Sequence, residues 1–280
     1  MKEILVPVDF SEESMIALEY AIALANHLKA NVRIIHVKTD ALIVPFFSKD
    51  KADDRLSQDV QAWCETLYDR YIKQYNVHCG VFDYKIREGV VVKEISNQAR
   101  YGDSTIMVLG AHKVESNGPK WLGSPAYRLV AHSPCPVIVL NRGMALHYEI
   151  KNIALPVDYS VASRKKVPAI AGLAKLFKAK VHVVGLLSSD LPWMNAQMRA
   201  YVKLVSDFLM TKAGVEVVQE QLTGREYAAN LMHYADTHNI DLLTAHVHHT
   251  NNPFVRLYQS FTNELINHSV KPVLIIPTKD

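Results

Sequence analysis

The sequence lacks the features that place a chain outside the cell or within a membrane. It has only three cysteines, Cys64, Cys79 and Cys135, and no pair of them has Cys-x-x-Cys spacing. No apolar run approaches the about 20 residues that cross a bilayer. The first residues, Met1-Lys2-Glu3, do not have the form of a signal peptide. These absences predict a cytoplasmic protein with reduced thiols and no membrane partner.

The chain also lacks an excess of charge of either sign. Its 31 lysines and arginines nearly balance 28 acidic residues, which leaves a net charge of +3. This balance gives no electrostatic reason to bind nucleic acid. With 49% hydrophobic and 21% charged residues, the composition is that of a globular protein. The length of 280 residues is enough for about two domains.

What the first half contains is an alternation of short apolar runs with segments of helical periodicity. Ser11 is a plausible N-cap of the first helix, since two glutamates follow it in the first turn. The expected strands are residues 4–8, 32–37, 77–86, 103–110 and 136–140, and the expected helices are residues 12–28, 60–71, 90–100 and 124–132. This order predicts an α/β domain with a doubly wound parallel sheet and helices on both faces.

Three residues at expected strand ends, Asp9, Val37 and Gly110, should line one crevice. Ligands of such sheets bind beyond the carboxyl ends of the strands, where the strand order reverses. Gly110 is followed by a polar loop, and Gly123-Ser124 then opens a short helix. A glycine at a strand end and free amides at a helix start can bind an anion. Ser124 could equally act only as an N-cap, and Asp9 only as a turn residue.

The pattern then repeats along the chain. Ile4–Ser11 returns as Ile153–Ser160 at an offset of 149, and Arg128–Val139 returns as Glu264–Ile275 at an offset of 136. Two copies are too few for a solenoid, so they predict tandem domains, residues 1–143 and residues 149–280, each with a five-stranded parallel sheet. The two fifth strands, 137–140 and 273–276, are short apolar edges that could pair as an intramolecular pseudo-dimer; a homo-oligomer is also left open.

These motifs resemble the universal stress protein family in a tandem form. The similarity rests on the strand ending in Pro7-Val8-Asp9, on Ile34–Val37, on Gly110-x-His112 through Gly123-Ser124, and on the closing His-Ser-Pro-Cys-Pro-Val. It implies an adenine nucleotide alpha hydrolase-like fold. It also implies binding of ATP or AMP, with or without Mg²⁺, in a regulatory stress-response role.

The resemblance also implies roles for single residues. Asp9 would contact the ribose or adenine, and Val37 would offer backbone groups to the adenine. Gly110 and His112 would approach the phosphates. The whole nucleotide-binding set is Pro7, Val8, Asp9, Val37, Leu109, Gly110, His112, Lys113, Gly123, Ser124 and Pro125. Lys113 stands where the family pattern has a glycine, and either strains the loop by about 1–2 kcal/mol or pairs with a phosphate.

The second copy keeps Asp158 but loses the small residues of the phosphate loop. At the offset of 136, His246 replaces Gly110, His249 replaces Lys113 and Gln259 replaces Gly123. These side chains should obstruct a phosphate tail, so we expect the second domain not to bind ATP in the family manner. His246 and His248 share one side of a strand and could begin a zinc site, although solvated histidines are the simpler interpretation.

No catalytic pair stands out in the sequence, so an enzyme is not the favoured interpretation. His112 could at most assist a slow hydrolysis of ATP. Two alternatives to a nucleotide-binding regulator stay open. One is a scaffold or interaction protein that has lost nucleotide binding in both domains, and the other is a weakly ATP-hydrolysing or metal-binding enzyme.

Overall fold

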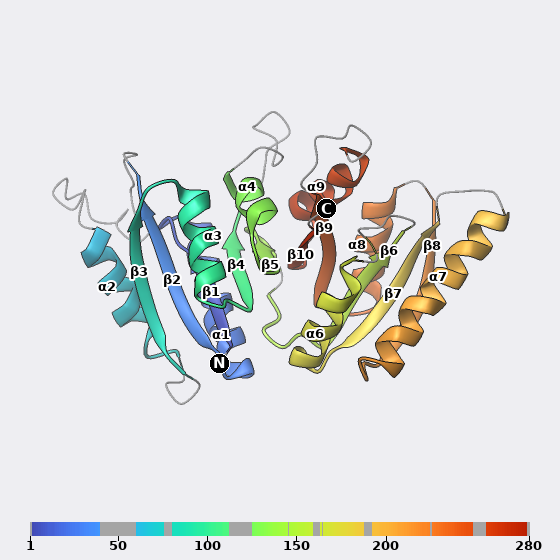
Figure 1. Cartoon of the computed structure of the whole chain (residues 1–280), viewed down its shortest axis with the longest axis horizontal. Helices are drawn as coiled ribbons and strands as arrows, with labels where there is room; N and C mark the ends of the chain where they lie inside the picture. Colours follow the sequence, from blue (N-terminus) through green and yellow to red (C-terminus); the bar gives the residue numbers. More distant parts are fainter. Residues whose placement is uncertain are drawn as a thin grey trace. The chain divides into compact units, whose positions relative to one another are not determined.

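The computed structural model describes residues 2–39, 60–75, 80–111, 125–144, 146–158, 163, 165–187, 192–224, 226–248 and 256–278. The chain divides into two compact units, Met1–Gly143 and Met144–Asp280. Figure 1 shows that each unit contains its own sheet with helices packed against it. Within the described residues, no helix is long and apolar enough to cross a membrane.

The first unit alternates strands and helices as the sequence predicts. Its elements are β1 (Glu3–Pro7), α1 (Glu12–Leu28), β2 (Asn31–Lys38), α2 (Val60–Tyr71), β3 (Phe82–Glu88), α3 (Val91–Tyr101), β4 (Ile106–Gly110), α4 (Pro125–His132) and β5 (Val137–Leu140). The third and fourth strands begin later than expected. β4 begins late because Asp103, with its left-handed backbone (φ 52°), still belongs to the turn after α3.

The second unit repeats this order. Its elements are β6 (Asn152–Val157), α6 (Val167–Phe177), β7 (Lys180–Leu187), α7 (Pro192–Thr211), β8 (Val217–Thr223), α8 (Tyr227–Thr237), β9 (Leu242–His248), α9 (Arg256–His268) and β10 (Val273–Thr278). Ile4 lies opposite Ile106 in the first sheet, and Ile153 lies opposite Leu242 in the second. The two registers therefore reproduce the offsets of 149 and 136 that the repeat shows.

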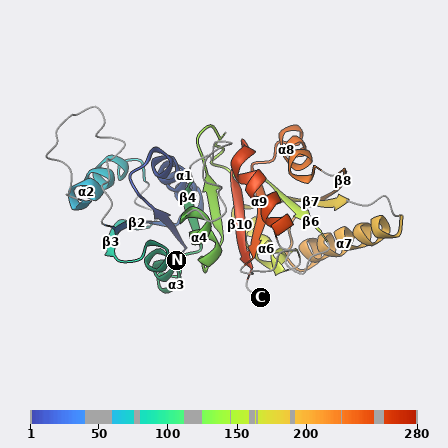
Figure 2. The ribbon, with the colours of Figure 1, turned by 90° about the horizontal axis from the view of Figure 1, so that it is seen from above.

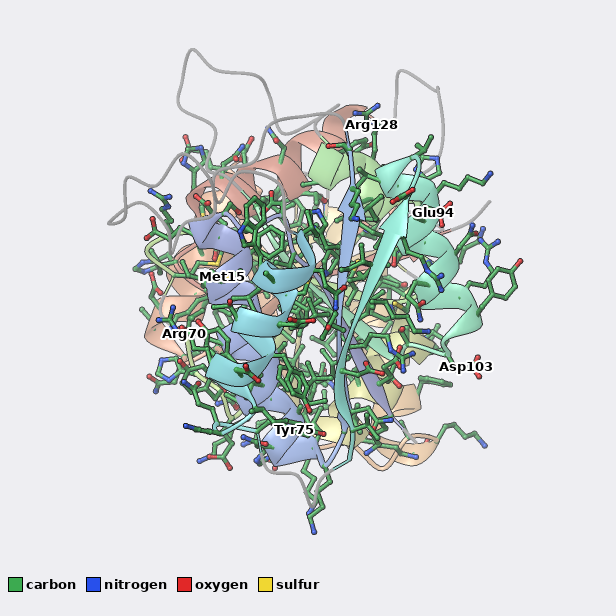
Figure 3. The ribbon with its side chains drawn as sticks, turned by 90° about the vertical axis from the view of Figure 1, so that its left-hand side faces the viewer. Met15, Arg70, Tyr75, Glu94, Asp103 and Arg128 are labelled. Atoms are coloured by element: carbon green, nitrogen blue, oxygen red, sulfur yellow. The ribbon has the colours of Figure 1, made fainter. Side chains whose placement is uncertain are left out.

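Each unit has a parallel five-stranded sheet with helices on both faces. The order is β3-β2-β1-β4-β5 in the first unit and β8-β7-β6-β9-β10 in the second. In Figure 2, α1 and α2 lie on one side of the first sheet and α3 and α4 on the other. Figure 3 faces the β3 edge and shows Arg70 and Tyr75 on one side of the sheet, with Glu94 and Asp103 on the other. The doubly wound α/β architecture is thus confirmed.

The central strand β1 is buried along its whole length, and four of its five residues are apolar. A polar network lies where β1 begins: Arg33 pairs with Glu3 at 2.8 Å and with Asp83 at 2.9 Å. Ser104 also donates to Glu3 at 2.8 Å. This network satisfies the one buried carboxylate of β1.

The first turn of α1 crosses the end of β4 closely. A Cβ atom added to Gly110 would collide with the backbone carbonyl of Glu13 and the amide of Ser14. Arg142, just after β5, holds this turn in place by pairing with Glu12 at 2.7 Å and with the buried Glu13 at 2.8 Å. Gly110 therefore has a packing role whatever ligand the crevice binds.

Gly110→Ala should accordingly lower the free energy of unfolding by about 1–3 kcal/mol, because α1 must shift to admit the methyl group. Gly172→Ala is the matched control. Gly172 lies inside α6 with nothing within 4 Å of an added Cβ, so this change should stabilise by about 0.5–1 kcal/mol. Urea unfolding measures the free energy of unfolding of both variants. If the two substitutions changed it equally, the close approach of α1 to Gly110 would be contradicted.

Candidate functional site

The strand order reverses between β1 and β4 in the first unit, which is where ligands of doubly wound sheets bind. The structure brings six of the predicted residues to this edge: Pro7, Val8, Asp9, Val37, Leu109 and Gly110. Pro125 opens α4. His112, Lys113, Gly123 and Ser124 lie outside the described residues, so their predicted roles remain predictions.

The backbone N–H and C=O of Val37 face the space beyond the end of β1. The amide of Val8 donates to the carbonyl of Ile35 at 2.9 Å, so the backbone groups of Ile35 face β1. Strand geometry has a period of two residues, hence the N–H and C=O of Val37 face the same way. Because β1 ends at Pro7, they face the space beyond it.

Gly110 presents backbone groups to the same space from the opposite side. The amides of Met107 and Ala111 donate to carbonyls along β5, of Pro136 at 2.9 Å and Leu140 at 2.7 Å. The alternate residue, Gly110, therefore directs its N–H and C=O toward β1. The crevice thus has a donor and an acceptor on each flank, from β2 and from β4.

The loop between β1 and α1 is held in a strained but well-bonded form. Asp9 is exposed, and its Oδ1 accepts hydrogen bonds from the amide of Ser11 at 3.0 Å and its hydroxyl at 2.6 Å. Ser11 in turn caps α1 by accepting from the amide of Ser14, as the sequence predicts. Between them, the buried Phe10 adopts a left-handed backbone (φ 62°), which costs about 1–2 kcal/mol for a residue with a side chain.

Aromatic packing keeps Phe10 in this conformation. Its ring lies 4.8 Å from that of His36 and meets Trp63 of α2 edge-on at 5.2 Å. His36 is buried, and its Nδ1 lies 2.7 Å from the carbonyl oxygen of Val8, so that nitrogen carries the proton and donates. Burial lowers the pKa of His36, which keeps the ring neutral beside the crevice.

The equivalent edge of the second unit is filled by polar side chains. Lys166 is fully buried, and its Nζ donates to the carbonyl of Pro156 at the end of β6, at 2.6 Å. On the other flank, Thr262 of α9 donates to the backbone carbonyl of His246 at 3.0 Å. By the offsets of 149 and 136, these two carbonyls are the equivalents of those of Pro7 and Gly110 in the first unit.

At the offset of 136, His246 of β9 stands where the first unit has Gly110. No Cβ fits at Gly110 in the first unit, because the first turn of α1 passes over it. His246 is buried in the second unit, so this position accommodates a whole imidazole there.

The proposed metal pair receives no additional ligand from the described residues. His246 and His248 both belong to β9, and the side chain of His248 is not among those described. Within the described ranges, no group of three or more histidine, cysteine or acidic side chains could hold a metal ion. Cys64 and Cys135 are buried free thiols, and burial raises their pKa values to about 12 and about 11.

Three of these residues were not singled out from the sequence. Lys166 could have been found by aligning the two copies, since the offset of 149 places it opposite the buried Ala17 of α1. Arg142 and the left-handed Phe10 give no such signal, because both depend on where the end of β5 and the ring of Trp63 lie in space.

Comparison with known proteins agrees with this fold. The model of the universal stress protein family matches residues 1–141 and again residues 149–277. The chain therefore belongs to the universal stress protein family, with two family domains in tandem. No curated protein sequence matches it.

Solved structures of the same architecture cover nearly the whole chain. A universal stress protein from Archaeoglobus fulgidus is 16% identical over 98% of this chain and 97% of its own, with a TM-score of 0.68. A putative universal stress protein from Pseudomonas aeruginosa is 14% identical over 100% and 93%, with a TM-score of 0.64. A third structure, a family protein from Arabidopsis thaliana solved with AMP bound, covers only 51% of this chain and 92% of its own, at 17% identity and a TM-score of 0.34.

Because the ammonium group of Lys166 is buried, we expect the protein to be more stable when an apolar side chain replaces it. Burial lowers the pKa of Lys166 from 10.5 to about 8, so the charged form is disfavoured in the folded state. The resulting penalty is complete below pH 8 and disappears as the pH rises from 8 to 10.5. Lys166→Met should therefore raise the free energy of unfolding at pH 7 by about 2–3 kcal/mol.

Urea unfolding between pH 7 and pH 10.5 measures this difference. The gain from Lys166→Met should shrink as the pH rises, whereas Lys175→Met, at an exposed lysine of α6, should change stability little at any pH. A variant that is less stable than the wild type at pH 7 would mean that the ammonium is well solvated or paired.

Proposed function

We propose that the first domain, residues 1–143, binds ATP or AMP at the end of β1, and that the second domain, residues 149–280, does not. The observation that carries this proposal is the pair of backbone edges at Val37 and Gly110, which face one another across the switch point beyond the end of β1. An adenine ring offers adjacent donor and acceptor nitrogens, which suit the N–H and C=O of one strand residue.

The ribose and phosphates then extend toward Asp9 and the start of α4. Asp9 is exposed at the mouth of the crevice, and its second carboxylate oxygen has no hydrogen bond among the described contacts. Carboxylates bind ribose hydroxyls well because both hydroxyls donate. In this proposal His112, Lys113, Gly123 and Ser124 form the phosphate loop, and Pro125 opens the helix whose amino end favours the negative charge, with or without Mg²⁺.

The role that fits this site is regulation in the stress response rather than strong catalysis. The stress-response role is that of the universal stress protein family as a whole. No base or nucleophile lies beside the described part of the crevice. The nearest imidazole, His36, donates its Nδ1 proton to Val8, and its Nε2 is buried. The cytoplasmic location, the association of the fifth strands and any homo-oligomer remain part of the proposal.

Asp9→Ala and Asp158→Ala form a matched pair that tests the proposal. If the first domain alone binds nucleotide, Asp9→Ala should weaken AMP and ATP binding at least tenfold, because it removes a charge-assisted hydrogen bond to the ribose. Asp158→Ala should leave the affinity unchanged. Isothermal titration with and without magnesium measures both affinities and the number of sites, which should be one per chain.

A conservative variant separates binding from folding. Asp9→Asn keeps an acceptor for the amide of Ser11, so α1 should start normally while the charge is lost. Nucleotide at 100 times its dissociation constant should stabilise the wild type by about 2.7 kcal/mol. If neither ATP nor AMP raises the melting temperature, the scaffold alternative replaces this proposal. Steady phosphate release that stops in Ser124→Ala would favour a weak ATPase instead.

A further inference from the structure

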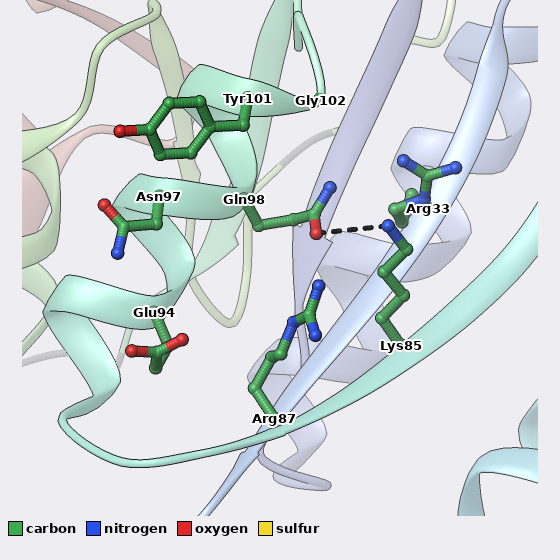
Figure 4. A pocket seen from close by; sticks show the side chains of 8 residues that line it. All are labelled: Arg33, Lys85, Arg87, Glu94, Asn97, Gln98, Tyr101 and Gly102. Carbon is green, nitrogen blue, oxygen red and sulfur yellow. Dashed lines mark hydrogen bonds between the residues drawn. The ribbon is translucent and has the colours of Figure 1, made fainter.

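A second polar cavity lies on the other side of the first domain, away from the β1–β4 crevice. It has a volume of about 240 Å³ between the edge strand β3, its neighbour β2 and helix α3 (Figure 4). Its lining is almost wholly polar: Arg33, Lys85, Arg87, Glu94, Asn97, Gln98, Tyr101 and Gly102. Neither the sequence pattern nor the family resemblance assigns a role to it.

Three cationic side chains converge in this cavity. Lys85 and Arg87 are two residues apart on β3, so both lie on the face that α3 partly covers. Arg33 stands on the same face of β2, since its register partner is Asp83. Figure 4 shows Lys85 in contact with Gln98 and Arg87 directed toward the same side chain, with Arg33 on the neighbouring strand beside Lys85.

The three cations are unequally neutralised. Arg33 is held by two carboxylates, with both of its Asp83 contacts at 2.9 Å and Glu3 at 2.8 Å. Lys85 has only a 3.4 Å contact to the amide oxygen of Gln98, near the limit of a hydrogen bond. Arg87 forms no ion pair or hydrogen bond within the described residues. Lys85 and Arg87 therefore each lack a carboxylate partner within the described residues.

The single acid of the lining does not cancel them. Glu94 lies in the first turn of α3, where the amino end of the helix stabilises its charge. No ion pair joins it to Lys85 or Arg87 within the described ranges. Gln98 of α3 places an amide beside Lys85, which can complete the hydrogen bonds of an oxyanion. Figure 4 shows Asn97 and the hydroxyl of Tyr101 turned away from the two cations.

Protection of an edge strand explains only part of this arrangement. Exposed charges on β3 discourage pairing with another chain, and the exposed Lys38–Glu88 pair at the end of the strand serves that purpose. That role does not require two cations without a carboxylate partner to meet the amide of Gln98 in a cavity. The volume is smaller than the 300–1,000 Å³ typical of drug-sized ligands, so the occupant is a small molecule.

We propose that this cavity is a binding site for a compact dianion, a phosphate group or a small dicarboxylate, held by Arg87 and Lys85 beside the amide of Gln98. Arg87 supplies the forked donor that matches two oxygens, and Lys85 supplies a point charge. The site is separate from the nucleotide crevice, and its occupant adds to nucleotide binding rather than replacing it.

Inorganic phosphate and succinate are the probes, added to the full chain at low ionic strength and followed by ¹H–¹⁵N correlation spectra. We expect saturable shifts of backbone amides in β3 and α3, unchanged when AMP is present at saturation. Arg87→Gln and Lys85→Gln should each weaken binding at least fivefold. Arg199→Gln and Lys203→Gln, which remove the same charges from exposed positions of α7, should not weaken it.

The two probes distinguish the sources of the dianion, since the tighter one identifies phosphate or dicarboxylate chemistry. The proposal is overturned if the shifts do not saturate, if they fall outside β3 and α3, or if the α7 variants weaken binding as much as the β3 variants. Failure of AMP to bind would remove the proposed function but leave this result intact, because the shifts at β3 and α3 do not depend on it.

Discussion

The early end of β1 is the constraint on which the candidate site depends. β1 stops at Pro7, while β2 continues to Lys38 and β4 to Gly110. Two strands thus extend past the strand between them, so the inward-facing backbone groups of Val37 and Gly110 lie beyond its last paired residues, Pro7 with Ile35 and Leu5 with Met107. Buried backbone groups of this kind need a partner, and in the proposed function that partner is the adenine ring.

The first turn of α1 connects this gap to the rest of the domain. Its approach to Gly110 requires a residue without a Cβ, and Arg142 secures the turn through Glu12 and Glu13. Asp9 and the left-handed Phe10 make the short connection from β1 to that helix. In the second domain His246 replaces Gly110, and the buried Lys166 donates to the carbonyl of Pro156 at the end of β6. The two copies therefore differ in the side chains at this edge of the sheet.

The sequence predicted the fold well because its signals are local or repetitive. Apolar runs such as residues 4–8 and 136–140 match β1 and β5 closely, and Ser11 caps α1 as its spacing indicates. The offsets of 149 and 136 reappear in the strand register. Strand starts were less accurate where turns intervene, as at Asp103. The roles of Arg142, Phe10 and the Arg87 cavity could not be predicted, since each depends on residues distant in sequence meeting in space.

The central claim is that the backbone of Val37 and Gly110 binds an adenine nucleotide while the second domain stays empty. The most direct measurement is amide chemical-shift perturbation on adding AMP to the labelled full chain. The account predicts the largest changes at Val37 and Gly110, with little change at Asp158 and His246. Changes centred on the second pair, or no saturable change at either, would contradict it.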